Sequence, residues 1–144
     1  MARSVDIKPF DELTRDELYR ILELRNLVFV VGQEITAVPE IDGRDPDCEH
    51  AMLWRDGRLL ATARIAVDDS SRKVGRVAVH PDFQRQGLGT ELMRAIQDHL
   101  GSRTAKLHAQ AYLEEWYLDL GWKRVGEPFE EAGIEHVEMR WSGR

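Results

Sequence analysis

Residues 74–93 read VGRVAVHPDFQRQGLGTELM, and this stretch joins an apolar strand to a helix through a turn that contains two glycines. Val77 to Val79 are consecutive apolar residues. Pro81 ends the strand because proline has no backbone N–H to give to a sheet. Apolar residues then recur at helical spacing from Leu88 to Leu100, and Gly101 is a typical helix stop. The stretch therefore predicts a strand–turn–helix unit.

The turn of this unit has the properties of an anion site. The first N–H groups of a helix have no intrahelical partners, and the helix dipole adds partial positive charge there. Gly87 and Gly89 allow a bulky anion close to the backbone, and Arg85 adds a positive charge. The alternative is a tight turn whose glycines serve only packing.

The order of residues in the turn resembles the signature Arg/Gln-x-x-Gly-x-Gly/Ala of the GNAT superfamily of N-acetyltransferases, with Gln84, Gly87 and Gly89 at the matching positions. In that family the loop holds the pyrophosphate of coenzyme A, and the preceding strand holds the pantetheine arm through backbone groups. The resemblance implies acetyl-CoA as co-substrate. It implies these contact residues: Val77, Ala78, Val79, Gln84, Arg85, Gln86, Gly87, Leu88, Gly89, Thr90, Gln110, Trp116 and Tyr117.

A second stretch, residues 109–122, is similar to the family motif Asn-x-x-Ala-x-x-Phe-Tyr-x-x-x-Gly-Phe. Tyr117 and Gly121 match it, whereas Gln110 and Leu113 depart from it. An amphipathic core helix that ends at glycine has a similar pattern. The two motifs occur in the family's order, so the resemblance covers about residues 54–139.

Two further segments resemble the ElaA-like branch of this family. They are residues 28–45 and residues 129–139. Gly32 is a departure, because glutamate commonly stands at that position in the branch. The departure leaves the assignment of a catalytic base near this position open, with Glu34 as a substitute.

The composition limits the class of protein. With 144 residues, 42% hydrophobic and 32% charged, the chain is expected to form one domain spanning residues 1–144. A net charge of −6 argues against a nucleic-acid partner. No apolar run approaches the ~20 residues that cross a membrane, so we expect a cytoplasmic protein. Cys48 is the one cysteine, so no disulfide framework forms.

Hydrophobic periodicity predicts three or four helices among about seven strands. The expected strands are 4–8, 49–55, 59–67, 74–79, 105–109, 123–126 and 134–141, the helices are 15–30, 88–100 and 112–121, and the turns are 56–57, 68–71 and 130–133. Thr14 and Glu17 have capping-box spacing before the first helix. This order predicts an α/β (α+β) fold: a single mixed, mostly antiparallel sheet with helices on both faces, as in the GNAT family.

Residues 32–48 show no period and carry five carboxylates: Glu34, Glu40, Asp42, Asp45 and Asp47. A long loop inside a compact domain is often functional. A solvated acidic connection is the alternative, and the sequence leaves both open. If the charges lie near a pocket, they favour a cationic amine as substrate.

Acetyl transfer to an amine needs a donor for the oxyanion, a proton for the leaving thiolate and a base for the amine. The resemblance places the backbone N–H of Val79 at the oxyanion. Tyr117 is protonated at neutral pH and can serve as the general acid, although it can also be a core residue. The candidate bases are Glu34, Glu40, Asp42, His50 and His136. The five histidines lack the spacing of metal ligands.

These observations predict an acetyl-CoA-dependent N-acetyltransferase that acts on a small or peptide primary amine by direct attack in a ternary complex. Two alternatives remain open: a non-catalytic acyl-CoA-binding or regulatory domain, and an acidic protein-interaction module. The presence of Tyr117 favours the enzyme. The sequence identifies neither the acceptor nor the oligomeric state, so a homodimer remains open.

Overall fold

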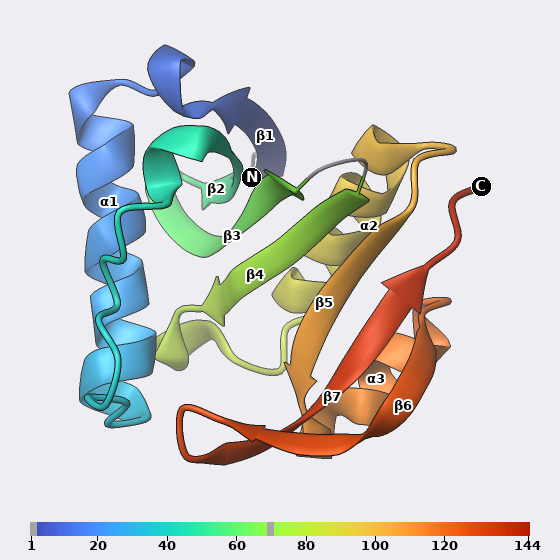
Figure 1. The fold of residues 1–144 in the computed structure, drawn as a ribbon. Helices are drawn as coiled ribbons and strands as arrows, with labels where there is room; N and C mark the ends of the chain where they lie inside the picture. Colours follow the sequence, from blue (N-terminus) through green and yellow to red (C-terminus); the bar gives the residue numbers. More distant parts are fainter. Residues whose placement is uncertain (1–2, 69–70) are drawn as a thin grey trace.

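A computed structural model describes residues 3–68 and 71–144, and its sheet has seven strands in the order β1-β2-β3-β4-β5-β7-β6 (Figure 1). The strands are β1 (Arg3–Pro9), β2 (Cys48–Arg55), β3 (Arg58–Asp68), β4 (Ser71–Val79), β5 (Ala105–Gln110), β6 (Lys123–Glu131) and β7 (Ile134–Trp141). Only the β4–β5 pair is parallel among the pairs in this sheet. The prediction of a mixed, mostly antiparallel sheet is confirmed.

Three α-helices pack on the sheet. They are α1 (Arg15–Arg25), α2 (Leu88–Leu100) and α3 (Glu114–Asp119), with short 3-10 helices at Phe10–Glu12, Asp45–Asp47, Pro81–Phe83 and Ala111–Leu113. Thr14 caps α1 as expected, since its side chain accepts from the backbone N–H of Glu17 at 3.0 Å while the Glu17 carboxylate accepts from Thr14. No helix in the described parts of the chain is long and apolar enough to cross a membrane.

The helices cover both faces, as predicted. Residues of α2 and α3 share one core cluster with inward residues of the central strands, including Leu92, Tyr117 and Leu107. Ile21 and Leu24 of α1 form a second cluster with Met52 of β2. Figure 1 shows α2 behind β4 and β5, with α1 standing beside β2 and β3.

Several predicted boundaries were wrong. The first helix does not continue as an α-helix to residue 30, because residues Asn26–Gly32 form a π-helix. Strand β6 extends past residue 126 to Glu131 across an irregularity in its pairing with β7, which moves the turn to residues 132–133. Gln97 interrupts the apolar spacing of α2, yet it is buried, and its Oε1 accepts from Trp122 Nε1 at 2.9 Å. The predicted turn at 68–71 includes residues 69–70, which lie outside the described residues.

Two features of β4 open the sheet. Pairing between β4 and β5 runs only from Arg72 to Val74, and beyond that point the strands diverge (Figure 1). On its other edge, β4 has one extra residue relative to β3 between Gly75 and Ala78, a β-bulge in which Arg76 has a φ of 52°. The bulge and the divergence occur at the same level of the sheet.

Candidate functional site

A groove runs through the gap between the diverging strands and has two halves. The α2 half is lined by residues 28–29, Gln33, Val77, Val79, 83–85, 87–90, Gln110, 112–113 and 116–117. The β7 half is lined by Phe29, Ile35, Val38, Glu40, Arg44, Arg64, Ala66, 73–77, 107–110, Leu113, Tyr117, 131–132 and His136. The two halves share Phe29, Val77, Gln110, Leu113 and Tyr117, so these side chains form their junction.

The edge of β4 that faces the groove is not paired with β5 beyond Val74. The His80 N–H donates to Leu60 O of β3 at 2.8 Å, and Ala78 pairs with Thr62. Backbone groups of successive strand residues point to opposite edges. Those of Val77 and Val79 therefore point away from β3, toward the groove.

The glycine turn combines two different uses of glycine. Arg85 and Gly87 have left-handed backbones, with φ of 62° and 76°, a conformation that occurs in backbone turns that bind anions. Gly89 has no such conformation. A Cβ there would lie 3.3 Å from the indole of Trp116 and 3.5 Å from Val79, so Gly89 is needed for close packing. Gly89 therefore serves packing, whereas anion binding at the turn around Gly87 stays a prediction.

Most of the expected coenzyme A contacts line the α2 half. They are Val77, Val79, Gln84, Arg85, Gly87, Leu88, Gly89, Thr90, Gln110, Trp116 and Tyr117. Ala78 and Gln86 line neither half: the Ala78 side chain is buried in the core, and Gln86 Oε1 accepts from Arg55 Nη1 at 3.1 Å.

Some of the lining residues brace the site rather than face outward. Gln84 Nε2 donates to Val79 O at 2.8 Å and ties the turn to the end of β4. Trp116 Nε1 donates to Thr90 Oγ1 at 3.0 Å and ties α3 to α2.

Tyr117 lies at the junction of the two halves and is 4% exposed. Its ring packs edge-on against Trp116, with centroids 4.7 Å apart. Burial raises the pKa of Tyr117, so the phenol keeps its proton at neutral and moderately alkaline pH. The side chain is therefore both part of the core and a proton donor beside the groove.

The acidic loop is fixed to the sheet by arginines. The fully buried Arg25 of α1 donates from Nε to Glu40 Oε2 at 2.6 Å and from Nη1 to Asp45 Oδ1 at 2.7 Å. Arg64 of β3 donates to Asp42 Oδ2 at 2.6 Å and to Asp45 Oδ1 at 3.0 Å. Buried charges persist in proteins when they are paired in this way.

The bulge residue Arg76 completes this cluster. Its Nε donates to Glu40 Oε2 at 3.0 Å, and its Nη2 lies 3.4 Å from Asp42 Oδ2. Three guanidinium groups therefore neutralise Glu40, Asp42 and Asp45, which removes the support that these charges gave to a cationic substrate. Hydrogen bonds from Arg64 are the main reason that the pKa of Asp42 is well below its usual range. Such a carboxylate is a weak proton acceptor.

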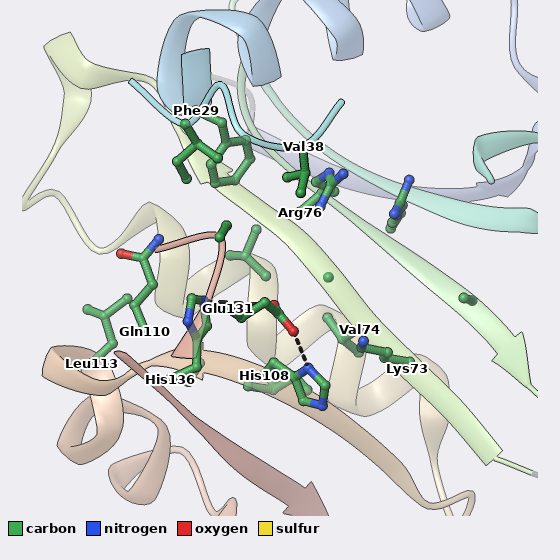
Figure 2. A pocket seen from close by; sticks show the side chains of 18 of the residues that line it. Phe29, Val38, Lys73, Val74, Arg76, His108, Gln110, Leu113, Glu131 and His136 are labelled. Carbon is green, nitrogen blue, oxygen red and sulfur yellow. Dashed lines mark hydrogen bonds and ion pairs between the residues drawn. The ribbon is translucent and has the colours of Figure 1, made fainter. Parts of the chain in front are cut away.

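Two histidines and a glutamate stand on the wall of the β7 half (Figure 2). His136 Nδ1–H donates to Ile134 O at 2.7 Å, which leaves Nε2 as the ring's acceptor when the ring is neutral. Glu131 Oε2 lies 3.9 Å from that Nε2, and Glu131 Oε1 lies 2.9 Å from His108 Nδ1. No group of three or more His, Cys, Asp or Glu side chains within residues 3–68 and 71–144 is arranged to hold a metal ion.

Sequence reasoning missed His108 and Glu131. The available signal was the alternation on β5, where Leu107 and Ala109 are buried and His108 points to the opposite, open face. Glu131 gave no signal, because the extension of β6 places it there.

The other candidate bases either lie away from the groove or are held by arginines. His50 is fully buried, and its Nε2–H donates to Asp45 O at 2.9 Å, so the proposal of His50 as a base was wrong. Glu34 is exposed and lines neither half. Of the carboxylates proposed as bases, only Glu40 reaches the β7 half, and it is bound by two arginines.

Comparison with known proteins places this groove in context. The family described as "Acetyltransferase (GNAT) domain" matches residues 30–142. The UPF0039 protein C11D3.02c of Schizosaccharomyces pombe is 39% identical in an alignment of 140 residues that covers 92% of this chain and 93% of that protein. Protein ElaA of Escherichia coli K12 is 35% identical in an alignment of 137 residues that covers 89% of each chain.

Solved structures agree with the sequence relatives. A crystal structure of an acyl-CoA N-acyltransferase from Pseudomonas aeruginosa has a TM-score of 0.87 and 36% identity, covering 96% of this chain and 99% of that chain. The crystal structure of Escherichia coli ElaA has a TM-score of 0.88 and 31% identity, covering 95% and 98%.

Proposed function

Because this chain belongs to the GNAT acetyltransferase family, in its ElaA-like branch, we propose that it transfers an acetyl group from acetyl-CoA to a primary amine by direct attack. The observation that supports the proposal is the arrangement of side chains and backbone groups at the junction of the two half-grooves. Backbone groups of Val77 and the backbone N–H of Val79 meet the protonated side chain of Tyr117 between two accessible half-grooves. A domain that only binds acyl-CoA has no need of a second half-groove.

The α2 half suits an acyl-CoA substrate. Its turn offers backbone N–H groups and Arg85 to a pyrophosphate, and the edge of β4 offers backbone groups to an amide-containing arm. Phe29, Leu113 and Trp116 provide an apolar wall. The acyl thioester supplies the carbon that the amine attacks.

The junction residues account for the leaving group. The amine nitrogen forms a bond to the thioester carbon, and the carbon–sulfur bond then breaks. The N–H of Val79 stabilises the oxyanion that develops between these steps. Tyr117 gives its proton to the departing sulfur, so that coenzyme A leaves as a thiol. The second proton that the nitrogen loses as it becomes an amide returns to the Tyr117 oxygen.

We assign the base to His136. It lines the β7 half, its Nδ1–H is held by Ile134 O, and its Nε2 is the atom left to accept a proton from the incoming ammonium. Glu131 Oε2 lies 3.9 Å from this Nε2. Glu40 and Asp42 are excluded as bases by their arginine partners.

The test is release of free thiol from acetyl-CoA in the presence of a mixed pool of primary amines. Thiol release that depends on the amines supports the proposal. Binding of acetyl-CoA without turnover of any amine would support the non-catalytic alternative. His136→Asn keeps an N–H near the position of Nδ1 and removes the base, so kcat should fall by ~10²-fold or more. Unchanged kcat would overturn the assignment of the base.

A further inference from the structure

Basic side chains outnumber acidic ones on the wall of the β7 half. The charged residues that line it are Arg44, Arg64, Lys73, Arg76, Glu40 and Glu131. Both carboxylates are occupied: Glu40 by Arg25 and Arg76, and Glu131 by His108. The acidic loop at residues 32–48 therefore gives this half-groove no free negative charge. The other carboxylate on the wall, Glu131, is paired with His108.

Two of the lining cations remain without a carboxylate partner. Arg64 and Arg76 bind the acidic loop, but neither Lys73 nor the Arg44 side chain forms an ion pair with any carboxylate among the described residues. Lys73 is half-buried, and the pKa of Lys73 is lowered by burial and by Lys106, Arg44 and Arg64, while Glu131 opposes the effect. An anion beside Lys73 would offset both burial and repulsion.

Lys73 lies at the end of the half-groove away from the reacting centre. It stands on β4 four residues before Val77, which corresponds to ~13 Å at ~3.3 Å per residue. Figure 2 shows it beside Val74, next to His108 on β5. A molecule that spans the β7 half would therefore place one end at His136 and Tyr117 and the other within reach of Lys73.

We infer that the acceptor is a primary amine that also carries an anionic group, carboxylate or phosphate, several bonds from its nitrogen. The anionic group binds Lys73 and Arg44, and the amine faces His136. This inference rests on the proposed acyl transfer and names the class of its acceptor. It replaces the purely cationic acceptor that the charge of residues 32–48 favoured.

The experiment compares acceptors that differ only in the anion. L-lysine is measured against cadaverine, which lacks the carboxylate, and O-phosphoethanolamine against ethanolamine, which lacks the phosphate. The first pair tests a carboxylate and the second a phosphate. In at least one pair, the anionic member should have the higher kcat/KM with acetyl-CoA at saturation.

The variant Lys73→Met tests the contact itself. It should lower kcat/KM for the anionic member by ~10-fold or more, because a charge-assisted hydrogen bond is lost, and should change the other member little. Lys106→Met is the matched control, since Lys106 pairs with Lys73 across the β4–β5 ladder but does not line the groove. Equal losses for both members of a pair, or equal losses in the two variants, would overturn the inference.

A binding measurement separates this inference from the proposed function. Calorimetry is run with each amine on protein saturated with coenzyme A, so that no acetyl donor is present. A preference for the anionic member that Lys73→Met abolishes supports the inference even if no amine is acetylated, a result that would overturn the proposed function instead. Turnover of all four amines without such a preference would retain the function and overturn the inference.

Discussion

The two halves of the groove are built from the chain in different ways. The α2 half comes mainly from two short segments, residues 77–90 and 110–117, in which the strand end, the turn and the helix start are neighbours in sequence. The β7 half brings together residues from the loop after α1, from β3, β4 and β5, and from the β6–β7 hairpin. The chemistry of a site built from neighbouring residues can be recognised in a sequence motif. The charge of a site assembled from several segments depends on pairing between residues that are distant in sequence.

The largest effect should come from the residue that joins the halves. Tyr117→Phe keeps the ring in the core and removes the proton donor, so kcat should fall by ~10²–10⁴-fold with little change in acetyl-CoA affinity. Steady-state kinetics under conditions in which chemistry is rate-limiting would show this. Tyr112→Phe is the control, because Tyr112 lies on the rim of the α2 half and is 75% exposed. If both variants retain kcat, Tyr117 serves only packing.

The next largest effect should come from the buried arginine that supports only the β7 half. Arg25→Met leaves Glu40 and Asp45 short of a partner in a buried setting, which should cost about 3 kcal/mol of unfolding free energy. The wall of the β7 half should loosen, so the KM of the acceptor should rise while the affinity for acetyl-CoA stays the same. Urea unfolding and calorimetry measure the two effects.

Arg20→Met on the same helix is the matched control for Arg25. Its ion pairs with Asp16 and Glu23 are exposed, so its loss should cost no more than about 0.5 kcal/mol. Similar losses in the two variants would mean that the buried cluster adds nothing beyond surface charge.

The sequence predicted the local half well and the assembled half poorly. Gln84, Gly87, Gly89 and Tyr117 have spacings set by one turn and one helix, so a pattern of residues describes their geometry. Arg25 and Asp45 stand twenty residues apart and meet through the tertiary fold. Nothing in the sequence around either residue indicates its partner, so the ion pairs that neutralise the loop were not predicted.

The same division applies to the fold. Alternation and helical spacing predicted the strands and α2, because each pattern reports which face is buried. The π-helix at Asn26–Gly32 was missed, since its apolar residues also suit an α-helix. That segment places Phe29 at the junction of the halves, and π segments often occur at functional sites.

Two glycine substitutions should affect opposite halves by ~10-fold each. Gly89→Val would push against Trp116, which lies 3.3 Å from a Cβ at that position, and should weaken acetyl-CoA binding. Gly75 lines the β7 half and has open space around its Cβ position, so Gly75→Val should narrow that half and raise the acceptor KM instead. The two KM values of each variant are the measurement. A loss of acetyl-CoA affinity in Gly75→Val, or none in Gly89→Val, would contradict the division of the groove.

The smallest effect concerns the response of the arginine cluster to acid. Hydrogen bonds from Arg64 lower the pKa of Asp42 in the folded state. In the unfolded chain, Asp42 has the ordinary aspartate pKa of about 3.9, so as pH falls the unfolded chain binds this proton first. The contribution of Asp42 to stability is therefore complete above pH ~4 and is lost as pH falls toward the folded-state pKa. Asp42→Asn should cost about 1 kcal/mol at pH 7 and less at pH 3. Urea unfolding of both proteins at the two pH values measures the difference.

Asp98→Asn, which removes an exposed ion pair with Arg144, should show a smaller loss of unfolding free energy with little dependence on pH. If Asp42→Asn lowers the free energy of unfolding equally at both pH values, the contribution of Asp42 comes from the geometry of its hydrogen bonds and not from its negative charge.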